Sequence, residues 1–172
     1  MTAARGCFDY AATVRPEWID YNGHMQDAYY GLVFSHAVDA LQDAVGFDAA
    51  YRARTGCTIY LVEDHKRYLR EVHEGDRLRV LTHVLGVDET RFHLRMTMLR
   101  GVEPVAIGEF LELHVAQRPK PHATPMLPGP RSRLEAARDA ACSSGQAERF
   151  TPWLPPLGAP RGKGAAGGAA GR

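Results

Sequence analysis

The sequence predicts one α+β domain in which an antiparallel five-stranded sheet packs against a single long helix. Apolar residues alternate with a period of two in one segment near the start of the chain and in four later segments, as they do in strands. Between them lies one segment with the period of a helix. Short turns join the last four strands, and short turns favour antiparallel neighbours. A chain of 172 residues suits one domain.

The first three elements are a strand, a loop and the helix. Residues 8–14 alternate as a short strand does, and residues 15–23 read as a loop. The helix begins near Asp27, an acid suited to a first turn, and ends near Gly46, a typical helix stop. Glycine inside a helix costs about 1 kcal/mol of stability relative to alanine. We expect that Gly31 is kept there because its lack of a side chain lets the helix sit close on the sheet. One helix face is apolar and carries Phe34, Val38, Leu41 and Val45.

Four predicted strands follow, over residues 59–69, 78–84, 92–98 and 105–115. In the first of them Glu63, His65 and Arg67 share the parity of Ile59 and Leu61, which places all five side chains on one face. By the same parity argument, Glu112 falls on the opposite face from the apolar residues of its strand, together with His83 and Arg95. One helix cannot cover both faces of the sheet, so we expect the chain to self-associate through sheet edges or faces.

Composition limits the classes of function. The formal net charge is +1, which does not favour nucleic acid or an anionic membrane as a partner. No apolar stretch is long enough to span a bilayer, and the first residues lack the apolar run of a secretory signal. Three widely spaced cysteines fit a reducing compartment and show no metal-ligand spacing. We therefore expect a cytoplasmic protein without a bound metal.

The chain divides into three parts by composition. Residues 1–118 hold the periodic segments and form the predicted domain. Residues 119–157 are a Pro-rich extension with one short helix over Arg131–Cys142. Residues 158–172 consist almost only of Gly, Ala, Pro and basic residues, offer little to bury, and are expected to be disordered.

A distinctive motif, Asp-Tyr-Asn-Gly-His-Met, occupies residues 20–25, directly before the helix. With the wider segment 14–30 and the segments 88–93 and 109–115, it resembles the hot-dog fold acyl-CoA thioesterases of the 4-hydroxybenzoyl-CoA thioesterase superfamily. The resemblance covers roughly residues 8–115. It implies a sheet wrapped around one central helix, self-association as dimers or tetramers, and an active site at the dimer interface. The longer segments resemble most closely the thioesterases of carnitine breakdown, which act on betainyl-CoA.

The resemblance implies roles for Asp20 and for the helix start, and the chemistry of thioester hydrolysis suggests roles for three other residues of the motif. The catalytic carboxylate falls on Asp20, which would attack the thioester carbonyl or activate a water; the sequence leaves both routes open. A backbone amide at the helix start, near Asp27, would polarise the carbonyl. Asn22 could hold Asp20 or the attacking water. His24 could orient Asn22 or Asp20, or it could donate a hydrogen bond to the carbonyl of the substrate. Gly23 would let the loop turn sharply or let the substrate approach the backbone.

Further candidates for substrate binding lie in the predicted strands. Lys66, Arg67 and Arg91 are candidate partners for the phosphates of CoA. Glu63 could face the positive charge of a betainyl group, which also favours aromatic faces. CoA is part of the substrate, so no separate cofactor is implied. The aromatic residues near the motif in sequence are Trp18, Tyr21, Tyr29, Tyr30 and Tyr60.

Two other functions fit the same residues. A hot-dog dehydratase or hydratase would use His24 with Asp20 on the acyl chain and release no thiol. A non-catalytic acyl-CoA-binding module would bind its ligand without turnover. The sequence contains no Gly-x-Ser-x-Gly motif, which argues against the α/β-hydrolase route to thioesters.

Overall fold

The computed structural model describes residues 6–143 and Leu157. The sheet is formed by β1 (Cys7–Thr13), β2 (Cys57–Tyr68), β3 (Arg77–Val87), β4 (Arg91–Arg100), β5 (Glu103–Ala116) and β6 (His122–Ala123). The helices are η1 (Pro16–Trp18), α1 (Asp27–Val45), α2 (Ala49–Thr55) and α3 (Pro128–Ser143).

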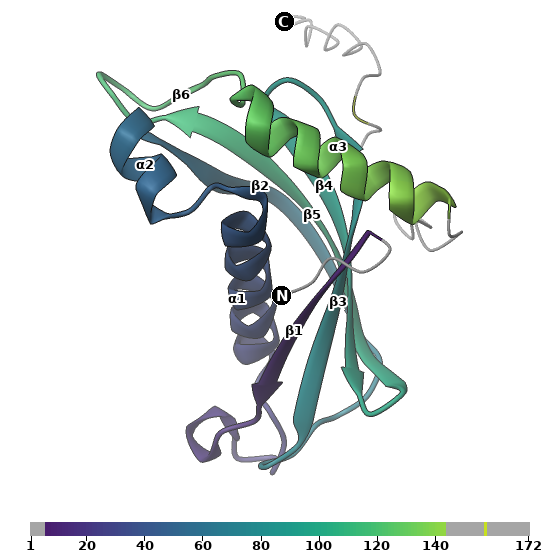
Figure 1. The fold of residues 1–172 in the computed structure, drawn as a ribbon. Helices are drawn as coiled ribbons and strands as arrows, with labels where there is room; N and C mark the ends of the chain where they lie inside the picture. The colour runs from purple at the N-terminus through teal and green to yellow at the C-terminus, as the bar shows by residue number, and fades with distance from the viewer. Residues whose placement is uncertain (1–5, 144–156, 158–172) are drawn as a thin grey trace, which may run out of the picture.

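The sheet is antiparallel and curls around α1 (Figure 1). Its strand order is β1-β3-β4-β5-β2, so β1 and β2 form the two ends of this path, and β6 adds a two-residue pairing with β5. The predicted fold class and the five predicted strands are confirmed. The short β6 and α2 were not predicted.

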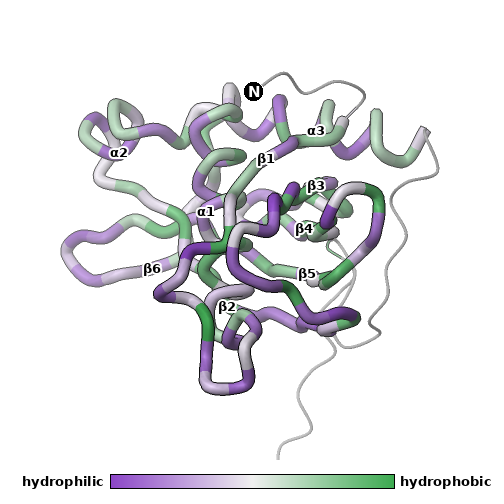
Figure 2. Tube along the Cα trace, turned by 90° about the horizontal axis from the view of Figure 1, so that it is seen from below, coloured by the Kyte–Doolittle hydropathy of each residue, from purple (hydrophilic) through white to green (hydrophobic). Residues whose placement is uncertain are grey.

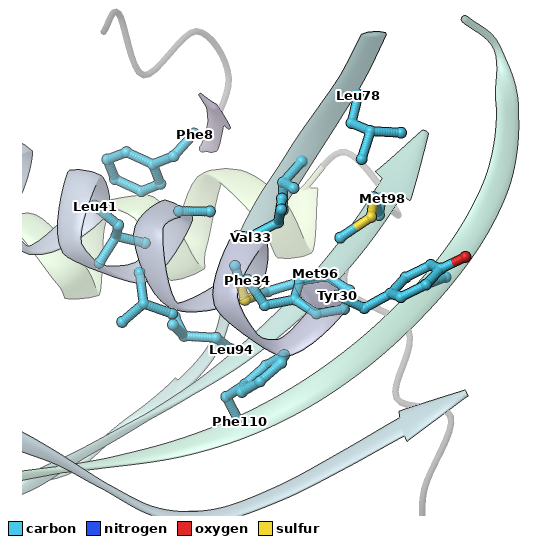
Figure 3. Close-up of a cluster of buried hydrophobic side chains, with 14 of the residues drawn as sticks. Phe8, Tyr30, Val33, Phe34, Leu41, Leu78, Leu94, Met96, Met98 and Phe110 are labelled. Atoms are coloured by element: carbon cyan, nitrogen blue, oxygen red, sulfur yellow. The ribbon is translucent and has the colours of Figure 1, made fainter. Parts of the chain in front are cut away.

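The core lies between α1 and the concave face of the sheet (Figure 3). Phe34 of α1 is fully buried, and its ring lies 5.3 Å from that of Phe110 in β5. The helix ends at Gly46, whose φ of 94° is left-handed and suits glycine. The reason expected for Gly31 is wrong: no heavy atom of the described residues, apart from its own helix, lies within 4 Å of the place of a Cβ there.

A bulge in β2 changes which of its residues face α1, so that odd-numbered residues face the helix before the bulge and even-numbered residues face it afterwards. Leu61 pairs with Glu112, but Glu63 pairs with the very next residue, Leu111, which leaves Val62 as the extra residue. Side chains alternate along a strand, so one extra residue reverses which of them face α1. The predicted grouping of Glu63, His65 and Arg67 with Ile59 is therefore wrong. After the bulge the residues on the face of Ile59 are Asp64, Lys66 and Tyr68.

The inner face of β5 also differs from the prediction. Phe110 belongs to the core, and Glu112, two residues further, shares its face and lines a cavity beside α1. The placement of Glu112 on the outer face with His83 and Arg95 is thus wrong. The apolar parity of β5 is misleading because Leu111 and Glu109 are buried on the other side of the strand.

Helix α3 covers the end of the molecule where α1 stops. Its Leu134 is fully buried in the core cluster, and Arg133 Nη1 donates to the carbonyl oxygen of Val45 at 3.0 Å. It contains the whole predicted helix and begins three residues earlier, at Pro128. The predicted disorder of residues 158–172 lies outside the described residues. None of the described helices is long and apolar enough to cross a membrane.

Candidate active site

The loop before α1 is a tight turn closed by backbone hydrogen bonds. The amide of Asp20 donates to the carbonyl of His24 at 3.0 Å, and the amide of Gly23 donates back to the carbonyl of Asp20 at 3.0 Å. Gly23 has a φ of 85°, where a Cβ would be strained. The amide of Met25 donates to the carbonyl of Val72 at 2.8 Å and ties the loop to the chain beyond β2. Gly23 therefore serves the turn that presents Asp20.

Two local hydrogen bonds orient the Asp20 carboxylate. The amide of Asn22 donates to Oδ1 at 2.8 Å, and the side-chain Nδ2 of Asn22 is 3.3 Å from Oδ2. Both donors come from two residues further along, so the turn itself sets the direction of the carboxylate. This contact corresponds to the positioning role suggested for Asn22.

The start of α1 offers free hydrogen-bond donors beside this carboxylate. Asp27 is the first helical residue, and the side chain of the preceding Gln26 makes no capping hydrogen bond to the first turn. The leading amides of a helix have no partners within the helix and carry the positive end of its dipole. Asp20 and Asp27 line one pocket of about 400 Å³. A carbonyl in this pocket can therefore meet a carboxylate and a helix N-terminus together.

His24 lines the same pocket but faces another acid. Its Nε2 lies 3.6 Å from Oε1 of Glu71, and its ring meets that of His73 edge-on with centroids 6.2 Å apart. The structure shows no hydrogen bond between the His24 ring and Asp20. His24 thus joins the motif to the segment after β2 and forms part of the pocket wall.

The predicted substrate-binding residues of the strands lie outside this pocket. Lys66 pairs with Asp64 on β2. Arg91 Nη2 lies 2.6 Å from Oδ2 of Asp88 in the β3–β4 turn. Burial raises the pKa of Asp88, but hydrogen bonds from Thr90 and Arg91 outweigh that effect and hold it below its ordinary value. Glu63 and Arg67 are exposed and lie on the face of β2 opposite Tyr68, and the bulge makes the face of Tyr68 the one that meets α1.

The sequence missed four consecutive residues that line the pocket: Tyr68, Leu69, Arg70 and Glu71. A motif search does not find them because they are about 50 residues from Asp20. The parity of β2 would place Tyr68 on the inner face only if the bulge were known.

Of the five aromatic residues named from the sequence, only Tyr30 lines the pocket. Trp18 and Tyr29 stack on each other at 5.5 Å, with Trp18 buried. Tyr21 is 97% exposed, and Tyr60 lies on the edge strand β2.

Figure 2 views the molecule from the end where α1 begins, and the loops there mix hydrophilic and hydrophobic segments.

Comparison with known proteins identifies the family of the chain. A family model of the thioesterase-like superfamily matches residues 14–150. The chain is 40% identical over 133 residues to the betainyl-CoA thioesterase of Pseudomonas aeruginosa. This match covers 76% of this chain and 83% of that protein.

Two solved structures have the same fold. One, from Pseudomonas putida, is 33% identical, with a TM-score of 0.72, and the match covers 86% of this chain and 94% of that one. The other is a hypothetical protein of Staphylococcus aureus in complex with CoA; it is 27% identical with a TM-score of 0.69 over 88% and 92% of the two chains. The sheet wrapped around α1, the motif before that helix and the match over most of the chain agree with one another. The chain belongs to the thioesterase-like superfamily and is an acyl-CoA thioesterase with the hot-dog fold.

Proposed function

We propose that this thioesterase hydrolyses a small acyl-CoA, betainyl-CoA, to the free acid and CoA, with Asp20 as its catalytic carboxylate. The observation that carries the proposal is the single pocket of about 400 Å³ that holds both Asp20 and the start of α1. The acyl group is inferred from the Pseudomonas aeruginosa relative. The CoA portion is supported by the Staphylococcus aureus structure, which was solved with CoA.

The helix start polarises the thioester in this proposal. The carbonyl oxygen accepts a hydrogen bond from the backbone amide of Asp27, where the helix dipole favours the developing negative charge. One such donor typically lowers the barrier by roughly 3–4 kcal/mol. The side chain of Asp27 has no required part in this step.

Asp20 supplies the second part of the chemistry by one of two routes. In the first, the carboxylate attacks the carbonyl carbon, the C–S bond breaks, and water hydrolyses the resulting anhydride. In the second, the carboxylate takes a proton from the water that attacks. Either route consumes only substrate and water. Hydrolysis in ¹⁸O-labelled water, followed by mass spectrometry of the peptide with Asp20, identifies the nucleophilic route if the label enters the carboxylate.

We also propose that the chain forms a homodimer through β2. This strand ends the main path of the sheet and exposes Tyr60, Leu61 and Val62 in succession. A bare, apolar strand edge is a natural template for pairing with a second copy. Tyr68, at the end of the same strand, lines the pocket of Asp20, so such pairing brings the partner near the site.

The substitution Asp20→Asn tests the catalytic role directly. The amide keeps the size of the side chain but loses the charge that attacks or accepts a proton. We expect thiol release from betainyl-CoA to fall by at least about a thousandfold, with CoA binding and the melting temperature retained. Thiol release separates hydrolysis from dehydration or binding alone.

Asn22→Ala provides the comparison in the same turn. It removes one of the two hydrogen bonds to Asp20 but leaves the carboxylate, so a smaller loss of activity is expected. Activity of Asp20→Asn within about tenfold of the unmodified enzyme, a difference of roughly 1.4 kcal/mol in barrier, would disprove the assignment.

A further inference from the structure

An aromatic pair stands in the pocket of Asp20. The rings of Tyr30 and Tyr68 meet edge to face, with centroids 5.2 Å apart and planes at 79°, and both residues line the pocket. Tyr30 is fixed, since it is buried and its hydroxyl donates to the carbonyl oxygen of Arg70 at 3.2 Å. Tyr68 is 49% exposed, which leaves much of its ring surface open to a ligand.

The charged groups of this pocket favour a cation. Three carboxylates line it, those of Asp20, Asp27 and Glu71. The basic side chains there are His24, which faces Glu71, and Arg70. Arg70 Nη1 donates to the carbonyl oxygen of Leu69, and its Nε lies 3.4 Å from Glu103 outside the pocket. The guanidinium of Arg70 is thus engaged elsewhere.

Chemistry restricts where the cation of the substrate can lie. In a betainyl thioester one methylene separates the quaternary nitrogen from the carbonyl carbon. A carbonyl beside Asp20 therefore holds the nitrogen within the same pocket. A quaternary ammonium cannot donate hydrogen bonds, so aromatic faces and nearby carboxylates are what bind it.

We infer that Tyr68, supported by Tyr30 and joined by Glu71, forms the subsite that selects acyl groups with a quaternary ammonium. The inference rests on the betainyl-CoA activity proposed above. It gives β2 a part in specificity, and it assigns this part to Tyr68 instead of Glu63. Trp18 and Tyr29 are excluded because their rings stack on each other outside the pocket.

The test compares betainyl-CoA with 3,3-dimethylbutyryl-CoA, in which a neutral carbon replaces the charged nitrogen and the shape is kept. The measured quantity is the ratio of kcat/KM for the two substrates. We expect the unmodified enzyme to prefer the cation, Tyr68→Leu to lower the ratio about tenfold, and Tyr68→Phe to retain it, because phenylalanine keeps the aromatic face. Glu71→Gln is expected to lower the ratio as well.

Tyr60→Leu is the matched control for the ratio, since Tyr60 lies on the same strand and has similar exposure but does not line the pocket. Any effect of this substitution on the proposed pairing edge should change kcat/KM for both substrates alike and leave the ratio unchanged. An unchanged ratio in Tyr68→Leu, or an equal loss on both substrates, overturns the inference. If the unmodified enzyme does not hydrolyse betainyl-CoA at all, the proposed substrate is wrong. That outcome differs from one in which betainyl-CoA is hydrolysed but the substitution at Tyr68 does not change the ratio, which would overturn the subsite alone.

Discussion

At the scale of single residues, Glu112 is the most unusual group of the inner face. Its side chain is 3% exposed, and its pKa is raised to about 7 by burial first, and then by the negative charges of Asp39 and Asp64. An ordinary glutamate in the unfolded chain ionises near pH 4.5. Between these two values the folded state binds more protons than the unfolded state. Stability therefore falls as pH rises from about 4.5 to about 7, by up to about 3 kcal/mol.

The substitution Glu112→Gln tests this dependence. Glutamine mimics the protonated acid, so the variant should exceed the unmodified protein in free energy of unfolding at pH 8 and match it near pH 4.5. Urea unfolding at both pH values measures the difference. Glu103→Gln is the control with the opposite sign, because hydrogen bonding to Arg100 lowers the pKa of that half-exposed acid. Equal stability of the Glu112 variant and its parent at pH 8 would contradict the assignment.

The residues of the site divide into those that sequence could predict and those that it could not. Asp20, Asn22, His24 and Asp27 lie within eight consecutive residues, so a recognisable motif was enough to place them together. Tyr68 reaches the pocket only through long-range pairing and a bulge. The apolar run around Val62 contains no glycine or proline that would mark such a bulge.

At the scale of elements, α1 begins and ends with acids whose effects on the helix should oppose each other. Asp27 lies at the positive end of its dipole and Asp43 in its last turn. We expect Asp27→Asn to lower stability and Asp43→Asn to raise it, each by about 0.5 kcal/mol. Thermal unfolding at low ionic strength measures both.

The same pair of variants tests whether the side chain of Asp27 takes part in catalysis. Because the proposed donor is the backbone amide, kcat/KM of Asp27→Asn on the neutral 3,3-dimethylbutyryl-CoA should stay within about threefold of the parent. A loss as large as that of Asp20→Asn would assign a chemical role to the Asp27 carboxylate and refute the proposal for the amide.

At the scale of the whole molecule, β2 is the exposed edge through which two copies are proposed to pair. Leu61 is 52% exposed on this strand, and a lysine there would place a charge in the middle of the pairing edge. We expect Leu61→Lys to shift the protein from dimer to monomer in light scattering and to reduce activity. Val102→Lys, at an equally apolar but isolated turn position, should change neither. A monomeric parent protein would rule the proposed interface out.

The overall architecture was predictable for a simple reason. Helical and strand periods survive local irregularities, so the order of the elements and the antiparallel pairing followed from the sequence. Which face of β2 and β5 meets α1 did not follow. In β2 the period changes phase in mid-strand, and in β5 both faces are buried, so hydrophobicity does not tell them apart.

The bulge at Val62 has a consequence for how selectivity can change within such a fold. If Val62 paired in regular register and the bulge were lost, Arg67 would take the place of Tyr68 on the face towards α1, and a guanidinium would replace an aromatic ring at the pocket. Deletion of Val62 would instead leave Tyr68 where it is, because the pairs on either side of the bulge would stay the same. The turn that carries Asp20 would be untouched. Hydrolytic chemistry and acyl preference thus depend on separate stretches of chain, and a change of register at this bulge is expected to alter the second without disturbing the first.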